Sequence, residues 1–167
     1  MSNVSNLSDL YIEELKDLWS ANDQMVRALK KMGPKATHPK LKQMLESSQK
    51  GITGHTDLLK ALIANQGEKV SKDHCKGMEG LVTEALKHTV EDGPDKGPVL
   101  DAALIAQYQR MTHYGITGFG TVAAFAKALK LTDDNQQLRA AVKDMYIADE
   151  LMTELAEAAV NVDALEE

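Results

Sequence analysis

Clusters of proline and glycine divide this chain into long segments that contain no proline in their interiors. All four prolines lie in two short clusters, Gly33-Pro34 with Pro39, and Gly93-Pro94 with Gly97-Pro98. Proline disrupts the interior of a helix but suits its first turn, so Pro39 and Pro98 are predicted to begin helices. The segments between and beyond the two clusters are therefore free to form long helices.

The spacing of apolar residues within these segments is helical. Apolar side chains recur at intervals of three and four residues, which is typical of amphipathic helices. Alanine and leucine, with 20 residues each, also favour helices over strands. The pattern predicts long helices over residues 7–32, 38–65, 98–130 and 133–161, and a shorter one over residues 75–91.

The long connection between the second and third long helices indicates the topology. It runs from Gly67 to Pro98 and is long enough to pass from one end of a bundle to the other. A full-length crossover of this kind is typical of ferritin-like bundles. We therefore predict one all-α domain over residues 1–167, a ferritin-like four-helix bundle with a short fifth helix in that connection.

Composition excludes several classes of function. The net charge of −6 and the pI of about 5.4 disfavour binding to nucleic acid. No apolar run is long enough to span a membrane, and the first residues lack the basic and apolar regions of a secretory signal. Cys75 is the only cysteine, so an intrachain disulfide and a cysteine-based zinc site are both excluded. We expect a cytoplasmic protein.

Cys75 has a local environment that affects its expected reactivity. The cationic side chains of His74 and Lys76 flank it, and nearby positive charge stabilises a thiolate. The sequence therefore predicts a slightly acidified thiol, although a single cysteine without a resolving partner is weak evidence for redox chemistry.

Few polar residues interrupt the core-facing positions of the long helices. A centre with two metal ions in such a bundle needs carboxylates from facing helices, but only Asp149 lies squarely on a core stripe. The other polar residues considered with it, Asn22 and His55, are neutral. These three residues could form one weakened metal site. We favour the alternative, in which they form a small buried hydrogen-bond network or lie at partly solvated edges of the stripes. Without a metal, a buried Asp149 must be hydrogen-bonded or protonated.

Three glycines follow one another closely in the third long helix, at Gly115, Gly118 and Gly120. Each costs about 1 kcal/mol relative to alanine inside a helix. They indicate a kink or a close packing contact, or else the approach of a ligand or another helix to bare backbone. The sequence leaves open whether that helix belongs to the same chain or to a second subunit.

Several segments carry a resemblance to a known family. They are Asp9-Leu10-Tyr11 with Glu14-Leu15-Lys16-Asp17-Leu18, Cys75-Lys76-Gly77-Met78-Glu79-Gly80-Leu81, Asp101-Ala102-Ala103-Leu104 with His113-Tyr114, and Ala148-Asp149 with Leu155-Ala156. Through these segments the chain resembles the YciF/YciE-type ferritin-like family of bacterial stress-associated proteins. The resemblance implies a compact bundle that is commonly dimeric and carries a di-metal centre.

The resemblance also implies that the metal centre has been lost. Five positions at which the family typically has carboxylates are neutral here: Asn22, Gly51, Thr112, Gly115 and Met145. Only His55 and Asp149 keep the capacity to bind a metal. Loss of large side chains at the two glycines would leave a cavity, large enough for water or a small apolar ligand.

These observations predict a stress-associated, non-catalytic binding or structural protein that forms a homodimer and has no cofactor. The alternative is a metal-dependent oxidoreductase, either an oxidase or a peroxide-consuming enzyme. It would hold iron, manganese or zinc at a remodelled centre of His55 and Asp149, with Glu14 or His113 as a further ligand. Neither interpretation includes a nucleic-acid or membrane partner, and the protein partner and stress signal are left open.

Overall fold

The described part of the chain, residues 4–70 and 74–165 of this computed structural model, is helical and contains no strand. Its helices are α1 (Leu7–Met32), α2 (Pro39–Asn65), α3 (Lys76–Leu86), α4 (Pro98–Ala128), α5 (Thr132–Leu155) and the single-turn α6 (Asn161–Asp163). Pro39 and Pro98 occupy the first positions of α2 and α4, as predicted. The side chain of Asn6 caps α1, because its Oδ1 accepts a hydrogen bond from the Asp9 amide at 2.9 Å.

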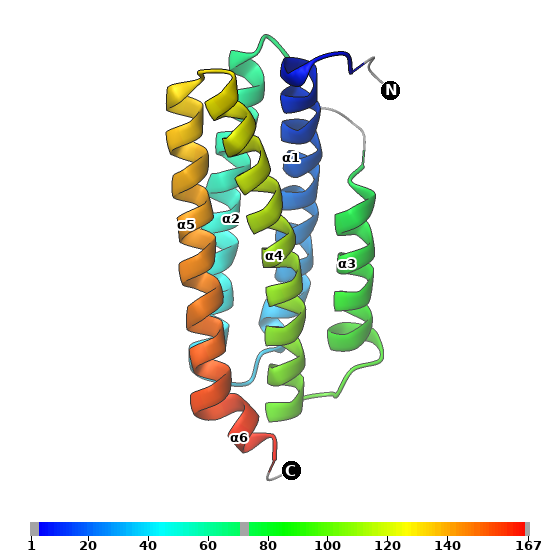
Figure 1. Cartoon of the computed structure of the whole chain (residues 1–167). Coiled ribbons are helices and arrows are strands. Elements are labelled where there is room, and N and C mark those ends of the chain that lie inside the picture. The colour runs from blue at the N-terminus through cyan, green and yellow to red at the C-terminus, as the bar shows by residue number, and fades with distance from the viewer. Residues whose placement is uncertain (1–3, 71–73, 166–167) are drawn as a thin grey trace.

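The helices form two antiparallel hairpins that pack into one bundle (Figure 1). In the first hairpin α1 packs on α2, and in the second α4 packs on α5; α1 also lies against α4. Contact between α2 and α5 is the least extensive of these four pairings. The connection from α2 to α4 runs the length of the bundle and carries α3, which packs outside on α1 and α4. The predicted fold class is confirmed.

Two helix ends differ from the sequence prediction. The predicted helix over residues 75–91 is regular only to Leu86, and Lys87–Glu91 form a π-helical turn. The predicted helix over residues 133–161 likewise passes into a π-helical turn at Ala156–Val160. A π turn accommodates one extra residue, so a pattern of threes and fours does not detect it.

A buried carboxylate fastens the two hairpins together at one end of the bundle. Asp101, in the first turn of α4, is 2% exposed. It accepts hydrogen bonds from the Thr37 amide at 2.8 Å, the Thr37 hydroxyl at 2.6 Å and the His38 amide at 2.8 Å. The connection between α1 and α2 is thereby held against the start of α4.

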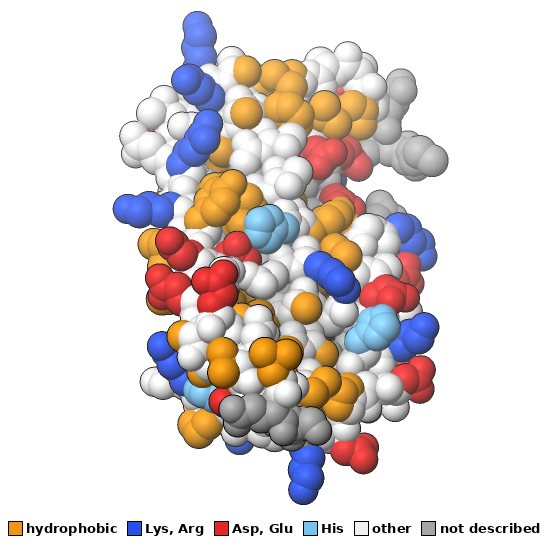
Figure 2. Space-filling view, turned by 60° about the horizontal axis from the view of Figure 1, so that its bottom comes forward, with side chains coloured by type: hydrophobic (Ala, Val, Ile, Leu, Met, Phe, Trp, Pro, Cys, Tyr) orange, Lys and Arg blue, Asp and Glu red, His pale blue; other side chains and the backbone are white. Residues whose placement is uncertain are grey.

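The hydrophobic core consists of two clusters of buried side chains, one toward each end of the bundle. One cluster includes Tyr11, Leu59 and Phe119, and the other includes Leu41 and Leu104. On the surface, Figure 2 shows hydrophobic side chains in separate patches between acidic and basic ones. Among the described residues, none of the helices combines the length and apolar character needed to cross a bilayer.

Candidate functional site

A cavity of about 500 Å³ lies between α1, α2, α4 and α5. We call it the central cavity. Its lining includes all five positions that the resemblance marks as lost metal ligands, namely Asn22, Gly51, Thr112, Gly115 and Met145, together with His55. Because these residues come from all four long helices, the cavity occupies the place where facing helices of such a bundle would present a metal centre.

The two glycines in the lining have different surroundings. A Cβ built on Gly51 would have no atom within 4 Å, whereas a Cβ on Gly115 would lie 3.1 Å from the Met145 sulfur. Gly51 therefore leaves open space beside α2, and Gly115 allows α5 to approach α4.

The other two glycines of the α4 series do not share one environment. A Cβ on Gly118 would overlap the buried side chain of Leu18 on α1, which identifies a close intrachain helix contact. A Cβ on Gly120 would meet no atom within 4 Å. The question that the sequence left open is answered at Gly118, where the facing helix belongs to the same chain.

Polar groups on the cavity wall are partly satisfied by one another. The Tyr108 phenol donates a hydrogen bond to the Ser48 hydroxyl at 2.9 Å, and burial raises the pKa of that phenol. Thr112 is 3% exposed, and its hydroxyl has no hydrogen-bond partner among the described residues. Thr112 lies close to the Tyr108 phenol, but the two side chains do not meet hydrogen-bonding geometry.

His55 and Asp149 lie in separate polar contacts. His55 Nε2 is 3.5 Å from an Asp144 carboxylate oxygen, and the His55 ring lies against Phe119 with ring centres 5.7 Å apart. Asp149 does not line the central cavity; one of its oxygens is 2.9 Å from His113 Nε2. The Asp149 carboxylate is half-buried and only partly satisfied, because its Oδ1 is buried and has no hydrogen-bond partner among the described residues.

The donor set does not fit a di-metal centre. Two cations require several carboxylates to offset their charge, whereas the Asn22, Thr112 and Tyr108 groups facing the cavity are neutral. Among the described residues of the lining, Asp144 supplies the single carboxylate, and its side chain is 67% exposed. No group of three or more His, Cys, Asp or Glu residues able to hold a metal ion occurs among the described residues.

A second hollow of about 460 Å³ lies on another face, between α1, α3 and α4. Its charged lining includes Glu14, Asp17, Arg110 and His113. Burial, reinforced by the charge of Asp17, raises the pKa of the Glu14 carboxyl. Sequence reasoning named Glu14 and His113 but missed Arg110, whose spacing of three residues from His113 could have placed both on one helix face.

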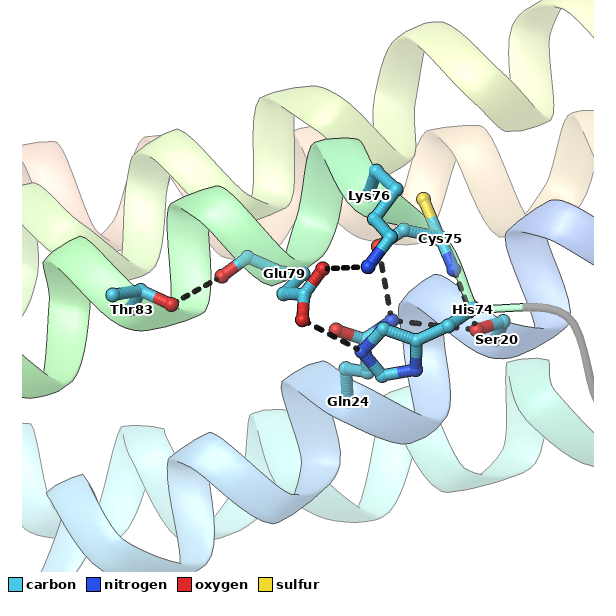
Figure 3. Close-up of polar contacts among 7 residues, drawn as sticks. All are labelled: Ser20, Gln24, His74, Cys75, Lys76, Glu79 and Thr83. Atoms are coloured by element: carbon cyan, nitrogen blue, oxygen red, sulfur yellow. Dashed lines mark hydrogen bonds and ion pairs between the residues drawn. The ribbon is translucent and has the colours of Figure 1, made fainter.

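The start of α3 is anchored to α1 by hydrogen bonds (Figure 3). The Ser20 hydroxyl accepts from the Cys75 amide at 3.0 Å, and the Gln24 amide donates to the Cys75 carbonyl at 3.1 Å. These contacts hold the buried Cys75 at the helix N-terminus. In Figure 3 the Cys75 side chain points away from Ser20 and His74.

The predicted acidification of the Cys75 thiol is wrong. Burial raises the pKa of this thiol, and its sulfur lies 3.0 Å from both an Asp17 carboxylate oxygen and the Tyr114 phenol. His74 and Lys76, the expected acidifying cations, instead lie against the Glu79 carboxylate at 3.7 and 2.8 Å (Figure 3). Their positive charges are thus partly neutralised by another group.

Comparison with known proteins identifies the family. The sequence model of a family described as "Domain of unknown function (DUF892)" matches residues 6–165. The chain belongs to the DUF892 family. Protein YciF from Escherichia coli (strain K12) is 31% identical over 163 residues, which cover 97% of each chain. The resemblance drawn from the sequence segments is therefore confirmed.

Two similar solved structures agree with the fold. The crystal structure of the E. coli stress protein YciF is similar with a TM-score of 0.87 and 30% identity, over 95% of this chain and 99% of that one. A second similar structure is YcfI from Rhodopseudomonas palustris, provisionally described as a structural protein. It has a TM-score of 0.83 and 29% identity, over 91% of this chain and 96% of that one.

Proposed function

We propose that this member of the DUF892 family is a non-catalytic, stress-associated binding or structural protein of the cytoplasm. The observation that carries the proposal is the central cavity, whose lining has neutral side chains where the YciF-type resemblance implies metal-binding carboxylates. A site without that negative charge cannot stabilise two cations. What remains between the four long helices is the central cavity.

In this proposal the protein is a homodimer. Large apolar side chains exposed one turn apart on one face of α5 support this part of the proposal: Ile147 is 47% exposed and Leu151 45%. Clustered apolar side chains of this kind are typical of protein interfaces. A second subunit on this face would remove them from water and would lie over the mouth of the central cavity, which Ile147 and Leu151 also line.

Thermal unfolding with and without a strong chelator tests the non-catalytic proposal. Because metal that binds only the folded state adds to stability, a metal-free bundle should unfold at the same temperature in both conditions. A clear fall in the unfolding temperature with chelator would contradict the proposal. Light scattering on the same sample should give the mass of two chains, and a monomer would contradict the dimer.

The enzyme alternative makes a different prediction. A remodelled centre at His55 and Asp149 requires tightly bound iron, manganese or zinc that is lost in His55→Ala or Asp149→Ala. The contacts made by these residues support the non-catalytic proposal, because His55 lies against Asp144 and Asp149 against His113. Stoichiometric metal that is lost in both variants would establish the alternative.

A further inference from the structure

The walls of the central cavity are mainly apolar and adaptable. Four of the eight methionines of the chain, Met25, Met44, Met145 and Met152, line it. Methionine is flexible and polarisable, and its sulfur makes favourable contacts with aromatic rings. A wall of this kind adjusts to the shape of an apolar guest, aromatic guests included. The volume of about 500 Å³ lies within the range of small-molecule sites.

Two polar groups on the wall have hydrogen-bonding capacity that the protein does not use. The Thr112 hydroxyl and His55 Nδ1 are buried atoms without a partner among the described residues. Both atoms are buried beneath the wall, so the space that the cavity offers to a guest is mainly apolar.

The charges around the cavity restrict the guest further. Among the described residues that line it there is no lysine or arginine. An anionic group would lack a cationic partner there and would face the carboxylate of Asp144. A cationic group would have only this one exposed carboxylate to pair with. Both kinds of ion would lose hydration without adequate compensation.

We propose that the central cavity binds an uncharged, mainly apolar small molecule. This inference rests on the proposed function, because a di-metal centre would occupy the same space. On the α2 side of the cavity, the missing side chain at Gly51 leaves room for the ligand.

Two fluorescent probes with the same aromatic rings test the charge and polarity of the ligand. N-phenyl-1-naphthylamine is neutral and has one N–H donor, and 1-anilinonaphthalene-8-sulfonate is the same molecule with an added sulfonate. The neutral probe should bind one per chain with a blue-shifted emission. The affinity for the sulfonate should be at least about tenfold lower, since its charge is unpaired in the cavity.

Matched glycine variants test the location. Gly51→Leu places a side chain in the open wall and should abolish binding of the neutral probe. Gly54→Leu is the control, because a Cβ on Gly54 also meets no atom within 4 Å but Gly54 does not line the cavity. Its affinity should match the parent.

Three results would overturn the inference: no saturable binding of the neutral probe, equal or tighter binding of the sulfonate, or equal binding by Gly51→Leu and Gly54→Leu. Circular dichroism and light scattering on each variant verify that the fold and mass are retained. Metal content measured on the same samples separates the two proposals. A metal-free protein that rejects the neutral probe contradicts the ligand alone, whereas two metals per chain contradict the proposed function.

Discussion

A Cβ on Gly115 of α4 would stand 3.1 Å from the sulfur of Met145 on α5. Both positions are marked by the YciF-type resemblance as places for carboxylates, and here a bare backbone faces a thioether. Two helices that would have pointed charged ligands at a metal thus contact each other through neutral groups. The neighbouring cavity remains open because Gly51, the corresponding position on α2, has nothing within 4 Å of a Cβ.

Restoring the carboxylates should restore metal binding. A variant with glutamate at the five neutral positions, Asn22, Gly51, Thr112, Gly115 and Met145, is expected to bind iron or manganese with an unfolding temperature that rises on metal addition. The control has glutamine at the same five positions, which matches the size of the side chains without their charge. Failure of the folded glutamate variant to bind metal would contradict the assignment of these positions.

Substitutions of two glycines should have opposite effects on stability. Gly54→Ala on α2 is expected to increase the free energy of unfolding by about 0.5–1 kcal/mol, because its Cβ meets open space and alanine favours the helix. Gly118→Ala is expected to decrease it by about 1–3 kcal/mol, because its Cβ overlaps Leu18 in the core. Urea denaturation measures both values. A stabilising Gly118→Ala would contradict the close packing of α4 on α1.

Removal of the buried Asp101 charge should loosen the junction between the hairpins. In Asp101→Asn one acceptor oxygen is replaced by an NH2 group, which is itself a donor. It would face groups of Thr37 and His38 that also donate hydrogen bonds. We expect a loss of about 2–4 kcal/mol in the free energy of unfolding. Asp95→Asn, an exposed position in the connection before α4, is the control and should change stability little. Equal effects of the two variants would show that the junction is unimportant.

Glu14 should make the protein less stable as the pH rises. Burial and the charge of Asp17 raise the folded-state pKa of Glu14 above its ordinary value of 4.5, so the folded state binds this proton more tightly than the unfolded state. The contribution of Glu14 to stability is therefore full below about pH 4 and is lost as the pH rises through its folded-state pKa. Glu14→Gln should be more stable than the parent at pH 7 and not at low pH.

Denaturation at several pH values measures this difference. Glu46→Gln, at an exposed position on α2, is the matched control and should follow the parent at every pH. If the gain from Glu14→Gln were the same at low and neutral pH, the effect would not come from the carboxyl charge.

The fold was accessible from the sequence because its signals are local. Pro39 and Pro98 mark helix starts wherever the helices pack, and the length of the connection between Gly67 and Pro98 determines that it can cross the bundle. The π-helical turns after Leu86 and Leu155 were not accessible, because a single inserted residue barely alters an apolar pattern.

The site was accessible only in part. Gly51 indicated open space because glycine removes a side chain, but the same expectation at Gly115 missed that the Met145 sulfur packs 3.1 Å from the place of its Cβ. The partners of His55 were not predictable, since they depend on the rotation of α5. Asp144 and Asp149 are five residues apart, which is about 140° around a helix, so one faces His55 and the other His113.

Elemental analysis of the purified protein tests the central claim most directly. The chain would be expressed in medium supplemented with iron, manganese and zinc, and the metal content would be compared with the protein concentration. The account predicts much less than one metal ion per chain, because the described lining of the central cavity offers one exposed carboxylate, Asp144, and otherwise neutral side chains. A ratio near two per chain would contradict it.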